Sequence, residues 1–193
     1  MLNKKSLVLM LFATASISIL QSSSTMAVEN SDCEDPLAVS SHTSLVSFFN
    51  AFEGGSWWGT MKITRINEDG SLFVRTATGA VGLQKDGLNR WRGGEGFCTS
   101  GETPNLCWDG IGGFRVLWSQ LFSGFGDYWT PVKVLESTPL SLVYIIQTGQ
   151  GLEASSTTVH EQILPASKQF IRHELFRSNG RITESRVFSG KRE

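Results

Sequence analysis

Hydrophobic and polar residues alternate in short runs through the C-terminal third of the chain. Each run is rich in Val, Ile, Thr, Phe and Tyr and ends at a break containing Gly, Pro, Ser or Asn, which predicts an antiparallel meander. Between the last two runs, Asn179-Gly180 predicts a two-residue hairpin, because a type I′ turn needs positive φ at both central residues and Asn and Gly tolerate it. The runs span residues 128–136, 140–148, 153–164, 168–178 and 181–190.

The pattern of the N-terminal half predicts one helix followed by shorter strands. Residues 43–52 place Leu45, Phe48 and Phe52 on one face at helical spacing, and Gly54-Gly55 ends this helix. A stretch rich in glycine follows, so the strands expected there are short. The expected strands cover residues 57–66, 71–78, 81–84 and 88–92.

Residues 114–122 fit two patterns. Phe114, Leu117 and Trp118 belong to an apolar helical stripe, and Gly124 is a natural stop for such a helix. Apolar residues also alternate in this segment as they do in a strand. We favour the helix and keep the strand as the alternative.

Eight to ten strands in sequential hairpins predict a mainly β fold, an antiparallel up-and-down β-barrel with one or two short helices. Closure into a barrel leaves no exposed strand edge. The last three strands carry polar residues on both faces, among them His160, His173 and Arg186. Because each buried polar group without a partner costs roughly 1–3 kcal/mol, a barrel around a partly wet cavity fits better than a dry core. Solvated strands on an open side are the alternative.

The first 27 residues are expected to be a cleavable signal peptide. Lys4 and Lys5 precede an uncharged apolar run, and Thr25-Met26-Ala27 has the small-x-small form of a signal-peptidase site. The mature protein is therefore expected outside the cytoplasm, in the periplasm or the extracellular space.

The remaining chain is expected to be one domain without a transmembrane segment. Residues 28–42 are predicted to be an N-terminal arm, and residues 43–193 the barrel domain. No segment after the leader approaches the roughly 18 apolar residues that a spanning helix needs.

Composition and charge limit the classes of partner. The chain is 40% hydrophobic and 18% charged, which is typical of globular proteins. Without the two lysines of the leader, 15 of the 17 Lys and Arg residues remain against 18 Asp and Glu residues. A balance so close to neutral, with no basic stripe, argues against nucleic acid and against a polybasic membrane surface, because phosphate contacts need concentrated Lys and Arg.

Three cysteines give a small choice of disulfides. Export permits a disulfide. Cys98 and Cys107 flank a short loop, and we expect them to pair, which makes the loop a candidate lid. Cys33 is then left free or joined to another chain, although a bridge through Cys33 stays open as an alternative.

Motifs at the two ends of the chain resemble the calycins, the group that contains the lipocalins and the fatty-acid-binding proteins. Gly55-Ser56-Trp57 is a G-x-W motif that follows a short helix and begins the first strand, and Arg186-Val187-Phe188 lies on the last strand. The resemblance implies a closing contact of Trp57 with an arginine, as in lipocalins, or an arginine that holds a ligand carboxylate, as in fatty-acid-binding proteins. Phe188 stands where the latter have Tyr, and the Thr-Asp-Tyr motif of lipocalins is not visible.

The hairpin registers place three polar side chains in one row. The turn at Asn179-Gly180 sets His173 opposite Arg186. A four-residue loop at residues 165–168 sets His160 opposite His173. If Arg186 follows the calycin pattern, all three side chains point inward.

Three interpretations of this row stay open. Arg186, with the histidines beside it, is a polar anchor for a ligand head group and binds a carboxylate bidentately. A metal or haem site on the histidines has no acidic or cysteine ligand at a recognised spacing, so we expect neither metal nor cofactor. The structural interpretation is a set of satisfied core groups, with Arg186 stacked on Trp57. Glu161 and Arg172 are expected to pair on the opposite, outer face.

Other candidate chemistry is sparse. The chain has no G-x-S-x-G motif, no P-loop and no G-x-G-x-x-G after a strand. Nothing places two of the carboxylates of Glu102, Asp109 and Asp127 together as a glycosidase pair. Most of the aromatic residues are expected in the core. Trp57 and Trp118 are candidates for ligand contact, with Trp118 near the mouth of the barrel.

We therefore expect an exported, calycin-like barrel that binds a small apolar or amphipathic molecule in its interior, through Arg186, His173, His160, Trp57 and Trp118. A structural or interaction domain with a filled barrel is the first alternative. An enzyme of unrecognised type is the second.

Overall fold

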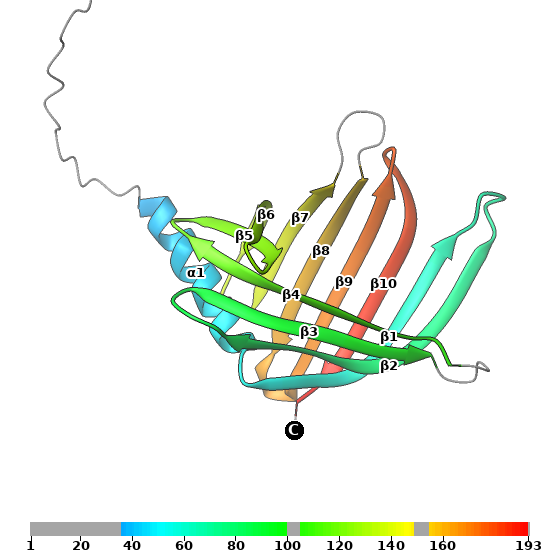
Figure 1. The fold of residues 1–193 in the computed structure, drawn as a ribbon, viewed down its shortest axis with the longest axis horizontal. Coiled ribbons are helices and arrows are strands. Elements are labelled where there is room, and N and C mark those ends of the chain that lie inside the picture. Colours follow the sequence, from blue (N-terminus) through cyan, green and yellow to red (C-terminus); the bar gives the residue numbers. More distant parts are fainter. Residues whose placement is uncertain (1–35, 100–104, 149–154, 193) are drawn as a thin grey trace, which may run out of the picture. The chain divides into compact units, whose positions relative to one another are not determined.

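The computed structural model describes residues 36–99, 105–148 and 155–192. The expected signal peptide, Cys33 and most of the loop between Cys98 and Cys107 lie outside these ranges. Within them the chain forms one α-helix and ten β-strands (Figure 1). The elements are α1 (Pro36–Phe52), β1 (Gly55–Ile66), β2 (Leu72–Lys85), β3 (Arg90–Thr99), β4 (Cys107–Leu117), β5 (Gln120–Phe125), β6 (Tyr128–Ser137), β7 (Ser141–Thr148), β8 (Ser155–Leu164), β9 (Gln169–Ser178) and β10 (Arg181–Lys191).

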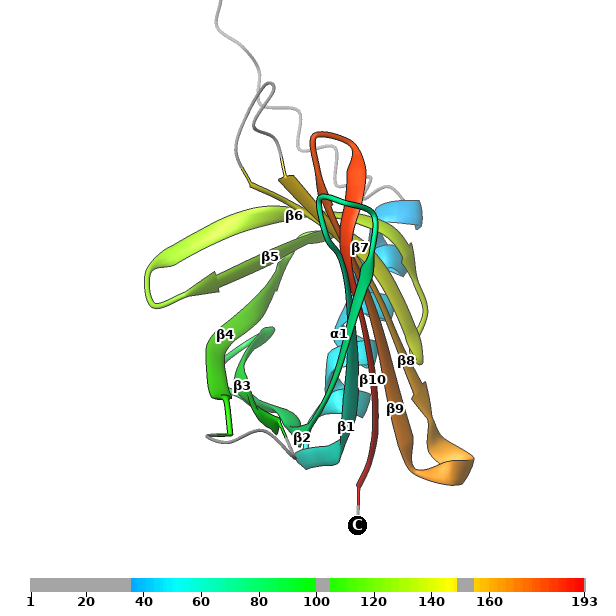
Figure 2. The same ribbon diagram turned by 90° about the vertical axis from the view of Figure 1, so that its right-hand side faces the viewer.

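The ten strands form a closed, antiparallel, up-and-down barrel. Each strand is hydrogen-bonded to its neighbours in sequence, and β10 closes the barrel against β1 from the pair Trp58–Lys191 to the pair Arg65–Glu184. The predicted fold class is confirmed, including all five strands of the C-terminal meander. Figure 2 shows β3 and β4 facing β8, β9 and β10 across the barrel.

Helix α1 lies at one end of the barrel, beside the C-terminal end of β4 (Figure 1). It begins at Pro36, earlier than predicted, and so takes in part of the expected arm. Proline suits the first turn of a helix, because the amide hydrogen that it lacks would have no partner there. The helix ends as predicted, since Gly54 and Gly55 both have positive φ and glycine adopts such φ without strain.

The predicted helix at residues 114–122 is wrong. This segment is the hairpin of β4 and β5, which turns at Trp118-Ser119. Trp118 adopts a positive φ of 53°, and Leu117 and Gln120 form the first pair of the hairpin. The alternation of apolar and polar residues therefore predicts this segment correctly, because Phe114 and Val116 share the inner face of the barrel while Leu117 is exposed. The hydrogen bonds of β4 with β3 and β5 stabilise the strand, although the apolar residues of this segment also have helical spacing.

The last hairpin turns where it was predicted and then changes register. Arg181 pairs with Ser178, and Asn179 and Gly180 both have positive φ. A β-bulge between Ile182 and Glu184 shifts the pairing by one residue. A shift of one residue turns the side chains that follow to the other face of the sheet.

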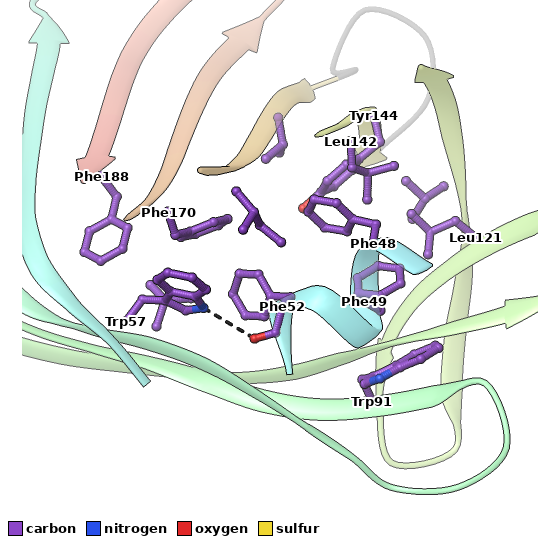
Figure 3. Close-up of a cluster of buried hydrophobic side chains, with 14 of the residues drawn as sticks. Phe48, Phe49, Phe52, Trp57, Trp91, Leu121, Leu142, Tyr144, Phe170 and Phe188 are labelled. Atoms are coloured by element: carbon purple, nitrogen blue, oxygen red, sulfur yellow. Dashed lines mark hydrogen bonds between the residues drawn. The ribbon is translucent and has the colours of Figure 1, made fainter. Parts of the chain in front are cut away.

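The buried core joins aliphatic and aromatic side chains, and its aromatic rings form a layer across the end of the barrel that holds α1 (Figure 3). Phe49 of α1 stacks on Trp91 with ring centroids 5.0 Å apart, and Phe52 meets Phe170 edge-on at 4.6 Å. Phe188 extends the layer, 6.1 Å from Phe170. These rings bury large apolar areas, so α1 is an integral part of the fold.

Two further contacts fasten the barrel. Cys98 and Cys107 form the predicted disulfide between β3 and β4. The indole ring of Trp57 packs under a C-terminal arginine, as the calycin resemblance implies, but that residue is Arg192, 4.1 Å above the ring. Arg192 also donates hydrogen bonds to the carbonyl oxygens of Phe52 and Glu53 and so ties the end of α1 to the last strand.

The described part of the chain contains no helix that is long and apolar enough to span a membrane.

Candidate functional site

An interior cavity of about 340 Å³ lies next to the aromatic layer. Phe114 and Tyr144 belong to both, since their rings contact each other and also line the cavity. Small ligands are commonly bound in pockets of about 300–1,000 Å³ that are apolar with a few polar groups, so this cavity suits a small molecule. Its other lining side chains include Val81, Leu83, Glu95, Ile146, Thr157, Val159, Arg172, Glu174, Phe176 and Arg186.

Glycines make room on the wall formed by β3 and β4. Gly110 and Gly112 line the cavity at positions where other strands carry inward side chains, whereas Gly93 lines it where a Cβ atom would clash with the carbonyl oxygen of Gly82. A Cβ atom built on Gly112 would meet no atom closer than the carbonyl oxygen of Gly124 at 3.9 Å. The space in front of Gly112 is therefore open to a ligand.

Arg172 of β9 is the centre of a group of buried charges on the opposite wall. Its Nε donates a hydrogen bond to Glu161 Oε1 on β8 at 2.9 Å, and its Nη1 donates one to Glu95 Oε2 on β3 at 2.9 Å. The Glu161 side chain is only 2% exposed and that of Arg172 11%. The guanidinium thus bridges the two walls of the barrel with charge-assisted hydrogen bonds.

Arg186 and Glu184 of β10 continue this network toward the rim. Arg186 Nε donates a hydrogen bond to Glu184 Oε1 at 2.6 Å, and Arg65 binds the other oxygen of Glu184 at 2.7 Å. The Arg186 guanidinium also lies 4.5 Å from the ring centroid of Phe176. We call the seven residues joined by these ion pairs the interior charge cluster; they are Arg65, Glu95, Glu161, Arg172, Glu174, Glu184 and Arg186.

Glu174 connects the two halves of the interior charge cluster through long contacts. Its carboxylate oxygens lie 3.8 Å from Arg172 Nη1 and 4.0 Å from Arg186 Nη1. Glu174 is in register with Arg186 on one side and with Val159 on the other, and Val159 is in register with Tyr144. Tyr144, Val159, Glu174 and Arg186 therefore form one inward row across four strands.

Burial and charge shift the pKa values of these groups in different directions. Burial raises the pKa of the Glu161 carboxyl, and the charge and hydrogen bond of Arg172 only partly offset it. Burial likewise raises the pKa of Glu174, against the nearby Arg172 and Arg186. For Glu184, hydrogen bonds from Arg65 and Arg186 outweigh the effect of burial and lower the pKa.

The predicted row of Arg186 and two histidines is only partly present. His160 and His173 are in register as predicted, with ring centroids 6.3 Å apart. Both side chains are exposed on the outer face of the barrel, whereas Arg186 lines the cavity. The prediction that His173 lies opposite Arg186 is wrong, because the bulge in β10 sets Glu174 there instead. The predicted pair of Glu161 and Arg172 forms, but inside the barrel rather than outside.

The two tryptophans predicted to contact a ligand lie away from the cavity. Trp57 is buried in the aromatic layer beside Phe52 and Phe170. Trp118 is 76% exposed at the turn between β4 and β5. Neither is among the residues that line the cavity.

The cavity uses residues that the sequence did not single out, above all Glu174 and Tyr144. Residues 170, 172, 174 and 176 alternate with the strand period and point inward together, so two charges are flanked by two phenylalanines on one face. That alternation was visible in the sequence. Which face was the inner one depended on the bulge.

Within the described ranges, no three His, Cys, Asp or Glu side chains come together as a group that could hold a metal ion. The chain matches no family model, no curated protein and no solved structure. The closed ten-stranded antiparallel barrel with one helix is consistent with a calycin-like fold.

Proposed function

We propose that this protein is an exported, calycin-like barrel that binds a small amphipathic molecule in its interior. The observation that carries the proposal is the cavity of about 340 Å³ with apolar side chains and a few convergent polar groups. Apolar walls supply affinity for a hydrophobic body, and placed polar groups orient it. The volume favours a small ligand over a long lipid chain.

The polar groups of the cavity have capacity left for a ligand. Among the described residues, nothing forms a hydrogen bond with the hydroxyl of Tyr144 or the carboxylate of Glu174, and both residues line the cavity. Burial raises the pKa of Tyr144, so its hydroxyl stays protonated at neutral pH and serves as donor or acceptor. A barrel with a filled interior is expected to bury polar groups only with hydrogen-bond partners, which the Tyr144 hydroxyl and the Glu174 carboxylate lack among the described residues.

Two observations support the remaining parts of the proposal. The disulfide between Cys98 and Cys107 fits an exported protein, because disulfides persist in oxidising compartments. The packing of Arg192 over Trp57 is similar to the closing contact that the lipocalin resemblance implies, although the motif on the last strand pointed to Arg186.

Native mass spectrometry tests the proposal on the protein as a cell exports it. The protein is purified without detergent, and its native mass is compared with its denatured mass. An additional discrete mass that is lost on denaturation is the expected result, and its identity names the ligand class. A bare polypeptide mass that persists after incubation with a panel of small amphipathic molecules would favour the filled structural barrel.

A further inference from the structure

Glu174 is the carboxylate of the interior charge cluster that lacks a hydrogen bond. Glu95 and Glu161 each accept one from Arg172, and Glu184 accepts from Arg65 and Arg186. Within the described residues no donor reaches Glu174, whose contacts with the two arginines are 3.8 and 4.0 Å long. Both guanidiniums are directed at other carboxylates, so Glu174 presents its oxygens to the cavity with acceptor capacity unused.

The interior charge cluster also carries more negative than positive groups. The ion pairs join four glutamates to three arginines. Burial raises the pKa of Glu174 even though Arg172 and Arg186 lie near it, so a further cation beside its carboxylate would stabilise the charged form. A carboxylate ligand would add a further negative charge beside Glu95, Glu174 and Glu184. A cation would instead balance the cluster.

We propose that the polar end of the bound molecule is a positively charged nitrogen, such as a primary ammonium, held by the carboxylate of Glu174. This inference rests on the proposed function, because it names the head group of the ligand in the same cavity. The ammonium donates a charge-assisted hydrogen bond to Glu174, and the hydroxyl of Tyr144, in the same row, accepts a second. Arg186 flanks the site: its Nε donates to Glu184, its guanidinium lies 4.5 Å from the ring centroid of Phe176, and its Nη1 lies 4.0 Å from Glu174.

The apolar body of the ligand then lies against the side chains around this row. Val81 and Leu83 of β2 and Ile146 of β7 line the same cavity, and the inward glycines of β4 leave space between them. An ammonium on a short apolar chain is therefore a class of ligand that fits both the charge and the volume.

Three probes that share one apolar chain and differ only in the head group test whether the cavity prefers a cation, a neutral group or an anion. Decylamine, decanol and decanoate are titrated into the protein at pH 7.5 by isothermal calorimetry. The variants are E174Q, which keeps the shape of the side chain and removes its charge, and E136Q as a matched control on the exposed surface of β6. Circular dichroism checks that E174Q is folded, as expected when a poorly paired buried charge is removed.

The inference predicts that decylamine binds the wild type most tightly. E174Q should weaken decylamine at least tenfold and leave decanol nearly unchanged, because the ammonium then meets a neutral amide instead of a carboxylate, while E136Q should bind like the wild type. Decanoate binding more tightly than decylamine, or decylamine binding unaffected by E174Q, would overturn the head group and leave the proposed function standing. If none of the three probes binds the wild type, this inference fails, and the native mass comparison decides the proposed function separately.

Discussion

Replacing Arg172 by leucine removes the side chain that holds two interior carboxylates from opposite walls of the barrel. Glu161, 2% exposed, loses its hydrogen bond of 2.9 Å, and Glu95 loses another of the same length. Removing one partner of a buried ion pair costs about 3–5 kcal/mol, because the other charge stays buried without compensation. We therefore expect R172L to lower the free energy of unfolding by about 3–5 kcal/mol at pH 7.5.

The cost should depend on pH in a defined direction. Burial already raises the pKa of Glu161 above its ordinary value of 4.5, and Arg172 is the group that opposes this rise, so R172L raises the folded-state pKa further. A carboxyl with a raised folded-state pKa destabilises the folded state only when pH exceeds the unfolded-state pKa. The penalty is therefore absent below about pH 4.5 and grows as pH rises from there toward the folded-state pKa.

Urea unfolding followed by tryptophan fluorescence measures this cost. Wild type, R172L and the double variant R172L/E161L are compared at pH 5 and pH 7.5. The cost of R172L should be smaller at pH 5, and the double variant should recover much of the loss, because a buried pair replaced by apolar residues is often neutral. A cost below about 1 kcal/mol at pH 7.5, or one that does not shrink at pH 5, would refute the reasoning.

Three further variants test other parts of the structure. Serine at both Cys98 and Cys107 should lower the free energy of unfolding by about 2–3 kcal/mol, measured against the oxidised wild type, and equal stability would contradict a closed loop in the native protein. Arg192→Met should cost about 2 kcal/mol in the same assay, since two hydrogen bonds to the end of α1 are lost, and an unchanged midpoint would speak against that contact. His160→Ala and His173→Ala should leave probe affinity unchanged in calorimetry, because both side chains lie outside the barrel, and a tenfold loss would place them back in the site.

Most of the fold could be predicted from the sequence, because the strands and turns are marked by patterns of neighbouring residues. The alternation in each C-terminal run and the turn at Asn179-Gly180 are set by neighbouring residues, and both predicted the structure. The segment at residues 114–122 failed, because its helical stripe and its alternation are both real local patterns. Pairing with β3, a tertiary contact, decides between them.

The candidate site was predicted less well, and one residue of register explains much of the difference. The bulge between Ile182 and Glu184 carries no Gly or Pro that would have marked it. Without the bulge, His173 lies beside Arg186; with it, Glu174 does. Because the sequence does not mark this bulge, the predicted row contained His173 and His160 beside Arg186, whereas the observed row contains Glu174, Val159 and Tyr144.

The capacity of the cavity to bind a small molecule is tested most directly by a pair of matched glycine variants. At Gly112 a Cβ atom meets nothing closer than 3.9 Å, so leucine there is expected to extend into the cavity; leucine at Gly96 projects from the outer face, where a Cβ atom meets nothing within 4 Å. Both variants and the wild type are titrated with N-phenyl-1-naphthylamine, an uncharged apolar probe whose fluorescence rises on burial. We expect saturable, equimolar binding to the wild type and to G96L, and at least a tenfold loss in G112L, from the several buried contacts that leucine displaces. Equal binding to all three proteins would contradict an interior binding site.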